Sequence, residues 1–511
     1  MHKKRSVGLI ISYANIIVNM VNGLVLSAFL LRVLGDVEFG LYQSVSSFIS
    51  YLVLLEFGTG TVMTRNISVC LNTEHGARRE ELLNRHYSTI WTISLILSCA
   101  ILLAGLIFYW SIDRIYVNTM TLEQVLYAKR ILLLLLGNLV MKYLVQNING
   151  YLLAHQEYAF AKFVLLIHGL IRTVLLIVVI SLCKYSILIA ILDLVLSSVV
   201  FIISLMYCKR GYSPVFSLRF FDRTIFKSSV PMCVALLLQA LTNQANNNVD
   251  KFIISVTMSM ESVALYSIVQ YVFTMFSSVA TVPIGMYLPE ISKTIAERSD
   301  AVNLTESLIR PCRLTVTICG SLLFGFIAVG RQFISTFYGA AKVEAWNYTL
   351  IILVPVFINM TDAVVISVLD VTNKRLARSL VLLGATVANI ILTILLMRIW
   401  GIYGAVIATA FSLVLEIIIM NLYYQRVLKI QVLYLFREAY RGLLPFQFIA
   451  GTAVFFLAKL ITSPLLSLLI GGVLYLVLSL GMIGLFGLNE QETNRVKGMI
   501  GKFTSRKKNS V

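Results

Sequence analysis

The sequence predicts an all-α integral membrane protein of about fourteen transmembrane helices. Two observations lead to this fold class. Of the 511 residues, 59% are hydrophobic and only 13% are charged, whereas an ordinary soluble domain has roughly 25% charged residues. The apolar residues also come in long runs of about 20, which is the length that an α-helix needs to cross the hydrocarbon layer of a membrane.

Reading the chain for such runs gives the predicted spans in order. Six of them lie at 8–31, 41–63, 88–110, 131–153, 160–182 and 186–206. Six more lie at 230–256, 263–288, 312–330, 347–369, 378–398 and 401–423, and a last pair at 442–461 and 464–487. The segments that connect these spans are short, so no soluble catalytic domain fits between them.

The basic residues indicate how the helices are oriented. With the amino terminus inside, the inner segments hold 30 Lys and Arg residues and the outer segments hold 10. This bias is the positive-inside pattern, so we expect a multi-pass protein of the bacterial inner membrane with both termini in the cytoplasm. The net charge of +18 follows from this topology, and we expect no nucleic-acid partner.

The motifs of common enzyme classes do not occur in the sequence. The five histidines form no His-Glu-x-x-His, the seven cysteines contain no Cys-x-x-Cys, and neither a phosphate-binding Gly-x-x-x-x-Gly-Lys loop nor a Gly-x-Ser-x-Gly elbow occurs. We therefore predict a transporter without catalytic residues, a metal site or a cofactor. A coupling ion, H⁺ or Na⁺, remains open.

An internal repeat suggests two lobes. The connection Gln156–Lys162 resembles Thr372–Arg378 at an offset of 216 residues, and the basic ends of spans six and twelve, Arg210 and Arg426, have the same offset. A parallel repeat of two lobes suits alternating access around a central cavity. The predicted divisions are a six-helix lobe at 1–210, a second at 211–426, two added helices at 427–488 and a basic tail at 489–511.

Four motifs, taken in order, resemble the polysaccharide and O-antigen flippases. They are Phe29–Gly35, Phe39–Tyr42, Leu55–Gly60 with Arg65, and Asp250-Lys251 followed by Ala264–Tyr266. The resemblance covers essentially the whole chain. It implies membership of the multidrug/oligosaccharidyl-lipid/polysaccharide exporter superfamily, although Glu56 stands where this family usually has Asp.

The resemblance also implies a substrate and partners. The substrate would be an oligosaccharide repeat unit on undecaprenyl pyrophosphate, moved to the outer leaflet for the synthesis of O-antigen, lipopolysaccharide or capsule. Membrane lipids, a polysaccharide polymerase and a chain-length regulator would be its partners. Arg32 matches the first-span arginine of the family and would bind the pyrophosphate, although it could equally anchor the helix at the membrane interface.

Polar residues recur on single faces of several spans. Because spacings of three and four residues fall on one side of a helix, these faces must line a wet cavity or bond to a neighbouring helix. We favour a cavity that binds sugars. The candidate sugar ligands are Asn15, Asn19 and Asn22 in span one, Asn138, Gln146 and Asn149 in span four, Gln239, Asn243 and Asn247 in span seven, and Gln270 in span eight.

Two cations lie near the middle of spans. Lys142 in span four and Arg172 in span five are costly there unless they have a charged partner or bind a substrate. The pyrophosphate group of a substrate would compensate their charge. Arg172 could instead pair with Asp193, which lies at a similar depth. Asp250, Asp193, Glu56 and Glu416 are candidates for ion coupling, and Glu416 has no evident partner in the sequence.

Two other functions remain open. A multidrug antiporter on the same scaffold would carry cations, and its cavity should then be acidic rather than basic. A membrane sugar polymerase would be expected to project a large outer loop, but the longest outer connection, 111–130, is short. The flippase is therefore the leading hypothesis.

Overall fold

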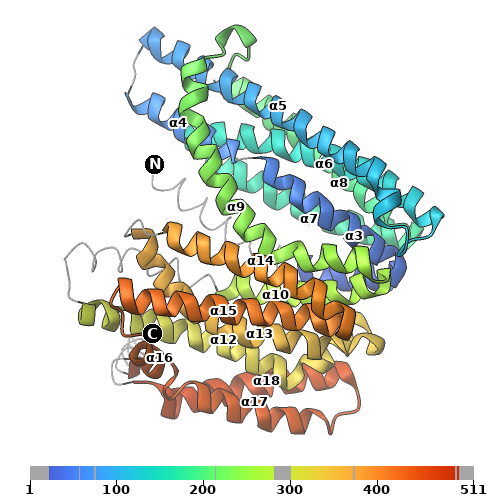
Figure 1. Cartoon of the computed structure of the whole chain (residues 1–511), viewed down its shortest axis with the longest axis vertical. Helices are drawn as coiled ribbons and strands as arrows, with labels where there is room; N and C mark the ends of the chain where they lie inside the picture. The colour runs from blue at the N-terminus through green and yellow to red at the C-terminus, as the bar shows by residue number, and fades with distance from the viewer. Residues whose placement is uncertain are drawn as a thin grey trace, which may run out of the picture. The chain divides into compact units, whose positions relative to one another are not determined.

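The computed structural model describes residues 22–280 and 301–493, apart from residues 57, 74–75, 213, 372–374 and 490–491. All regular elements in these residues are helices (Figure 1), so the predicted all-α class is confirmed. Eleven helices are long and apolar enough to cross a membrane, or twelve if a pair bent by 47° counts as one span. The predicted number of fourteen is not reached within the described residues, and the first predicted span falls mostly outside them.

The chain forms two compact units. Unit 1 comprises Met1–Ile268 and Met397–Ala405, and unit 2 comprises Val269–Leu396 and Val406–Val511. Span seven of the sequence therefore makes most of its contacts with unit 1. The lobe limits inferred from the repeat, 1–210 and 211–426, stay a prediction.

Unit 1 begins with short helices and continues with long ones. Its elements are η1 (Asn22–Leu26), α2 (Ser27–Leu34), α3 (Asp36–Leu52), η2 (Val53–Glu56), α4 (Thr59–Thr73), α5 (Gly76–Ile115), α6 (Leu122–Ala154), α7 (Tyr158–Cys183), α8 (Ile187–Tyr212), η3 (Leu218–Phe220), α9 (Arg223–Thr257) and the first part of α10 (Met260–Ala280). α6 is packed against α4, α5 and α8, and α7 lies beside α8.

Small residues allow helices α4 and α6 to approach closely. A Cβ atom added to Gly150 would lie 2.3 Å from the main-chain oxygen of Gly60. The Thr64 hydroxyl donates to the main-chain oxygen of Gly150 at 2.9 Å. Close approach through glycine is a common way to join helices in membranes, where apolar burial gives little preference for one neighbour over another. This contact fixes α6, which carries the candidate site, to the rest of unit 1.

Unit 2 contains the remaining helices. They are the second part of α10, α12 (Ala301–Tyr338), η4 (Ala340–Lys342), α13 (Ala345–Val371), α14 (Arg375–Trp400), α15 (Ile402–Val427), α16 (Val432–Tyr440), α17 (Leu444–Ala458), α18 (Pro464–Met482) and η5 (Ile483–Gly487). The end of α14 and the start of α15 are grouped with unit 1. α12 contacts α13, α16, α17 and α18.

A buried arginine joins α12 to the carboxyl-terminal helices. The Arg313 guanidinium binds both carboxylate oxygens of Glu492 at 2.8 and 2.9 Å. It also donates to the main-chain oxygens of Glu438, Arg441 and Gly487 at 2.8–2.9 Å. All its N–H groups are therefore used, which is what a buried charge requires. The link holds the break between α16 and α17 and the end of η5 against α12.

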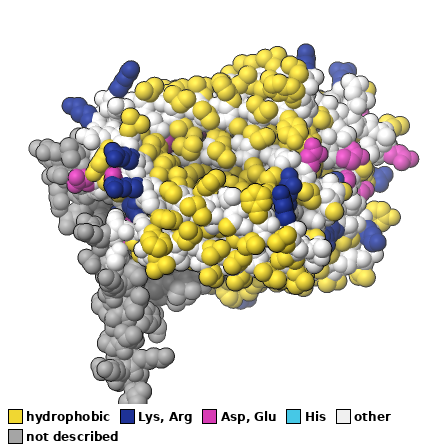
Figure 2. All heavy atoms as spheres, turned by 90° about the horizontal axis from the view of Figure 1, so that it is seen from below, with side chains coloured by type: hydrophobic (Ala, Val, Ile, Leu, Met, Phe, Trp, Pro, Cys, Tyr) yellow, Lys and Arg dark blue, Asp and Glu magenta, His cyan; other side chains and the backbone are white. Residues whose placement is uncertain are grey.

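Figure 2 shows one face of the molecule, on which hydrophobic side chains cover the middle and charged side chains gather toward the two ends. Large hydrophobic residues of α17 and α18 are exposed, among them Phe448, Phe456, Leu469 and Val477. Exposed apolar side chains between charged ends are typical of helices that face lipid.

Candidate functional site

Lys142 lies in the middle of α6 in unit 1, and its side chain is exposed. Its ammonium group has no hydrogen bond or ion pair with any residue in the described part of the chain. The charged groups that act on it are Asp193 on α8, which attracts it, and Arg172 on α7, which repels it. An exposed cation without a partner inside a membrane-spanning helix is available to bind an anion.

Arg172 and Asp193 form a two-pronged ion pair between α7 and α8. Arg172 Nε lies 2.5 Å from Asp193 Oδ1, and Nη2 lies 2.9 Å from Oδ2. The Asp193 side chain is only 6% exposed and that of Arg172 is 28% exposed. The sequence left two roles open for Arg172, and in this geometry its charge is already compensated by the carboxylate.

The polar residues of α6 have different surroundings. Asn138 is buried and accepts a hydrogen bond of 2.7 Å from the Ser197 hydroxyl of α8, which is a contact between helices. Gln146 is exposed, and its side chain lies near the Glu56 carboxyl at the end of η2. Asn149 is partly exposed. Along this polar face of α6, Asn138 is therefore buried against α8, whereas the residues from Lys142 onward are exposed or partly exposed.

Several of the predicted sugar ligands have side chains outside the described part of the structure. Asn15 and Asn19 lie outside the described residues, Asn22 begins η1, and Gln239, Asn243 and Asn247 lie on α9, but their side chains are outside the described part. Arg32 is exposed near the end of α2. Gln270 is partly exposed on α10 and belongs to unit 2.

The end of α9 carries two buried charges side by side. Asp250 accepts a hydrogen bond of 2.9 Å from the Tyr266 hydroxyl of α10. Lys251 is 8% exposed and donates to the Gln43 side chain of α3 at 2.8 Å. These contacts tie α3, α9 and the start of α10 together within unit 1. Asp250 is thus part of a buried polar network.

Unit 2 contains a second group of buried acids. Asp362 on α13 accepts a hydrogen bond of 2.9 Å from Asn421 on α15. Glu416 on α15 is 5% exposed and interacts with Asn359 and Arg378, partners that the sequence alone does not reveal because they lie on other helices. Among the described residues, no cluster of His, Cys, Asp or Glu is arranged to hold a metal ion.

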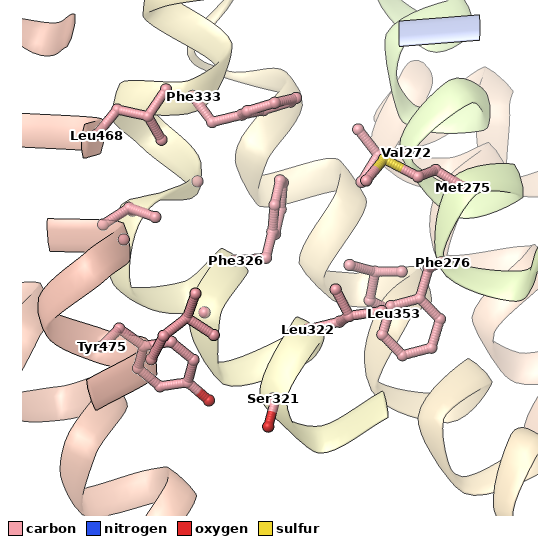
Figure 3. A pocket seen from close by; sticks show the side chains of 15 residues that line it. Val272, Met275, Phe276, Ser321, Leu322, Phe326, Phe333, Leu353, Leu468 and Tyr475 are labelled. Carbon is pink, nitrogen blue, oxygen red and sulfur yellow. The ribbon is translucent and has the colours of Figure 1, made fainter. Parts of the chain in front are cut away.

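An apolar pocket of about 270 Å³ opens in unit 2 (Figure 3). Side chains from α10, α12, α13 and α18 line it, including Phe276, Phe326, Phe333 and Leu468. Hydroxyl groups come only from Ser321 and Tyr475 among its lining residues. Such a lining offers almost no hydrogen bonds and is suited to a hydrocarbon group.

Comparison with known proteins identifies the family of the chain. Residues 7–295 match the family described as "Polysaccharide biosynthesis protein". The chain belongs to this family. No curated protein matches the chain.

Solved structures support the fold. A structure described as "Lipid II flippase MurJ, inward closed conformation" shares 15% identity, covers 93% of this chain and 98% of its own, and has a TM-score of 0.66. An inward-facing multidrug resistance MATE family transporter of the MOP superfamily shares 16% identity, covers 82% of this chain and 95% of its own, and has a TM-score of 0.62. At these identities the likeness is one of fold. This chain of the polysaccharide biosynthesis family is therefore a multi-pass membrane protein with a transporter fold.

Sequence reasoning missed two residues of unit 1. His168 lies four residues before Arg172 on α7 and interacts with Lys142, Arg172 and Asp193. Its spacing from Arg172 was a visible signal, because residues four apart share a helix face. Gln43, the acceptor for Lys251, gave no comparable signal, since its partner is distant in the sequence.

Proposed function

We propose that this protein is a flippase for a lipid-linked oligosaccharide. It moves a repeat unit carried on undecaprenyl pyrophosphate across the bacterial inner membrane for the synthesis of a surface polysaccharide such as O-antigen or capsule. Membership of the polysaccharide biosynthesis family supports the class of substrate. The observation that carries the proposal is Lys142, an exposed ammonium in the middle of a membrane-spanning helix, with no partner in the described part of the chain.

The polar residues of α6 in unit 1 suit the pyrophosphate and sugar parts of this substrate. A charge-assisted hydrogen bond from Lys142 compensates a pyrophosphate oxygen, and the exposed amide of Gln146, one turn further along α6, binds sugar hydroxyls. Considered by itself, the apolar pocket of unit 2, lined by Phe326 and Phe333, is suited to a hydrocarbon group. The buried acids Asp362 and Glu416 of unit 2 are the groups that we propose for coupling to H⁺ or Na⁺.

The test is a charge series at position 142. Lys142→Arg should keep substantial export of polysaccharide at normal protein levels. Lys142→Gln should lose export, and Lys142→Glu should lose more of it. Loss of one charge-assisted contact should weaken binding of an isoprenoid pyrophosphate about ten- to a hundredfold. Lys184→Gln, in the turn after α7, is the matched control and should behave as the wild type.

The same series distinguishes the multidrug alternative. If Lys142→Glu exports polysaccharide at the normal rate, the cation does not serve an anionic substrate. If that variant also extrudes a cationic dye faster than the wild type does, a cation antiporter is the better description. Deletion of the gene should leave the lipid-linked repeat unit on the cytoplasmic leaflet.

A further inference from the structure

His168 is a polar residue of unit 1 to which no role has been assigned. Its Nε2 atom is buried and has no hydrogen-bond partner among the residues that the structure describes. Buried polar groups are nearly always paired, because an unpaired one costs free energy comparable to a lost hydrogen bond. This nitrogen can therefore accept a hydrogen bond from, or donate one to, a group outside the described residues, such as a bound ligand.

The surroundings of His168 are charged. His168 interacts electrostatically with Lys142 of α6, Arg172 of its own helix and Asp193 of α8. α7 also contacts α2 and η1. η1 has no titratable residue, and the charged residue of α2 is Arg32, which is exposed near its end. Three helices thus bring two cations, one acid and an imidazole into one cluster.

The charge balance of the cluster favours an anion. Arg172 and Asp193 compensate each other through their two short contacts. Lys142 then leaves the cluster with one net positive charge while the imidazole is neutral. A lipid-linked pyrophosphate has a negative charge on each of its phosphate groups, so Lys142 alone does not balance it. Binding of this anion would add negative charge beside His168 and thereby favour the imidazolium form.

We propose that His168 is a second ligand of the anionic group bound by Lys142, and that it takes up a proton when that group binds. This inference rests on the proposed function, and it names the residue that makes binding depend on pH. A charge-assisted hydrogen bond from the imidazolium would satisfy the unpaired nitrogen and add to the contact from Lys142. The site would then hold its cargo more tightly in mildly acidic than in mildly alkaline solution.

Purified protein in detergent and farnesyl pyrophosphate as the probe allow a direct test. The dissociation constant is measured by calorimetry between pH 6 and pH 8 for the wild type, His168→Asn and His168→Gln. The probe also titrates in this range, so the comparison between proteins, rather than the wild-type profile alone, carries the result. The wild type should bind about tenfold more tightly than His168→Asn at pH 6 and equally at pH 8.

His86→Asn is the matched control. The Nδ1 atom of His86 is also buried, with no partner among the described residues, but its charged neighbour is Asp222 rather than Lys142. This variant should therefore keep the wild-type profile. The glutamine variant of His168 serves if the asparagine variant does not fold, and both should bind more weakly than the wild type at pH 6 and equally to it at pH 8.

The outcomes separate this inference from the function on which it rests. If the wild type binds the probe and both His168 variants follow the same pH profile as the wild type, His168 is a packing residue and the inference is wrong, while the flippase remains. If the wild type does not bind the probe at any pH, the proposed pyrophosphate site itself is wrong.

Discussion

The ion pair between Arg172 and Asp193 compensates the charge of one of the two cations that lie in the middle of spans in unit 1. Both oxygens of the carboxylate contact the guanidinium, and this arrangement is geometrically specific as well as strong. In a membrane-spanning helix a charge without a partner is costly, so the pair lowers the cost of having Arg172 in α7. Lys142 lacks such a partner among the described residues, and the role proposed for it is to bind the anionic group of the substrate.

Exchange of the two charges tests this assignment. Arg172→Ala alone should lower the melting temperature in detergent by several degrees, because a buried carboxylate without its partner costs roughly 3–5 kcal/mol. Arg172→Asp combined with Asp193→Arg should recover most of the stability and of the export. Recovery of stability without any recovery of export would mean that Arg172 itself contacts the cargo.

The pair of Lys129 and Asp113, in which the acid is exposed although the lysine is only 14% exposed, is a suitable control for this exchange. Their charged atoms are 2.6 Å apart, but the Asp113 side chain is 52% exposed. Exposed ion pairs contribute about 0–1 kcal/mol. Asp113→Asn should therefore change neither the melting temperature nor export to a measurable degree.

The sequence predicts only part of the site at this scale. The ion pair between Arg172 and Asp193 could be foreseen as an alternative, because both residues lie at similar depths in adjacent spans. The partner of Asn138 could not, since the sequence does not say which of two neighbouring helices a polar face meets. The same limit applies to Glu416, whose partners come from two other helices.

At the scale of elements, the fit of α4 against α6 depends on glycine. Gly150→Ala would bring a methyl group within 2.3 Å of the main chain of α4, and main chain cannot move aside as the end of a side chain can. We expect a cost of roughly 1–3 kcal/mol, visible as a lower melting temperature. Gly137→Ala on the same helix, where the nearest atom is a leucine methyl at 3.4 Å, should be tolerated.

The start of α9 gives a prediction about pH. Asp222 caps this helix by accepting from the main-chain N–H groups of Thr224 and Ile225 at 2.8 and 3.3 Å. The bond from Thr224 is the main cause that lowers the pKa of Asp222 below its ordinary value of 3.8. A lowered pKa means that the stabilisation is present above the ordinary value and is lost as the pH falls through the lower, folded-state value.

Asp222→Ala should therefore cost about 1 kcal/mol at neutral pH. Thermal unfolding of the wild type and the variant, measured from pH 7 to pH 3, should show a constant difference down to about pH 4. Below that the difference should shrink. A difference that stays constant to pH 3 would mean that the carboxylate does not act through its charge.

Helix type and order could be predicted from the sequence, but helix length could not. α5 extends over 40 residues, Gly76–Ile115, whereas its apolar run predicts only 88–110. The apolar run marks only the part of the helix that needs an apolar surrounding. The polar turns before it belong to the same helix because their sequence contains no residue that ends a helix. The bend of 47° between α16 and α17 was likewise hidden, since the apolar run at 442–461 includes only the second of the two helices.

At the scale of the whole molecule, the distribution of basic residues predicts the orientation in the membrane. Reporter fusions after Arg210 and after Arg426 should report the cytoplasm, and a fusion after Lys342 should report the outer side. The carboxyl-terminal tail should also be cytoplasmic. An outer location for that tail would contradict a model with an even number of spans and an inner amino terminus.

The contacts of Arg313 make α12 depend on the last helices of the chain. Main-chain oxygens of Glu438, Arg441 and Gly487 and the carboxylate of Glu492 receive all the N–H groups of this side chain. A chain cut after α15 would lose every one of these acceptors and would leave a buried guanidinium unpaired, which is costly. We therefore expect a variant that ends after α15 not to accumulate as a folded protein.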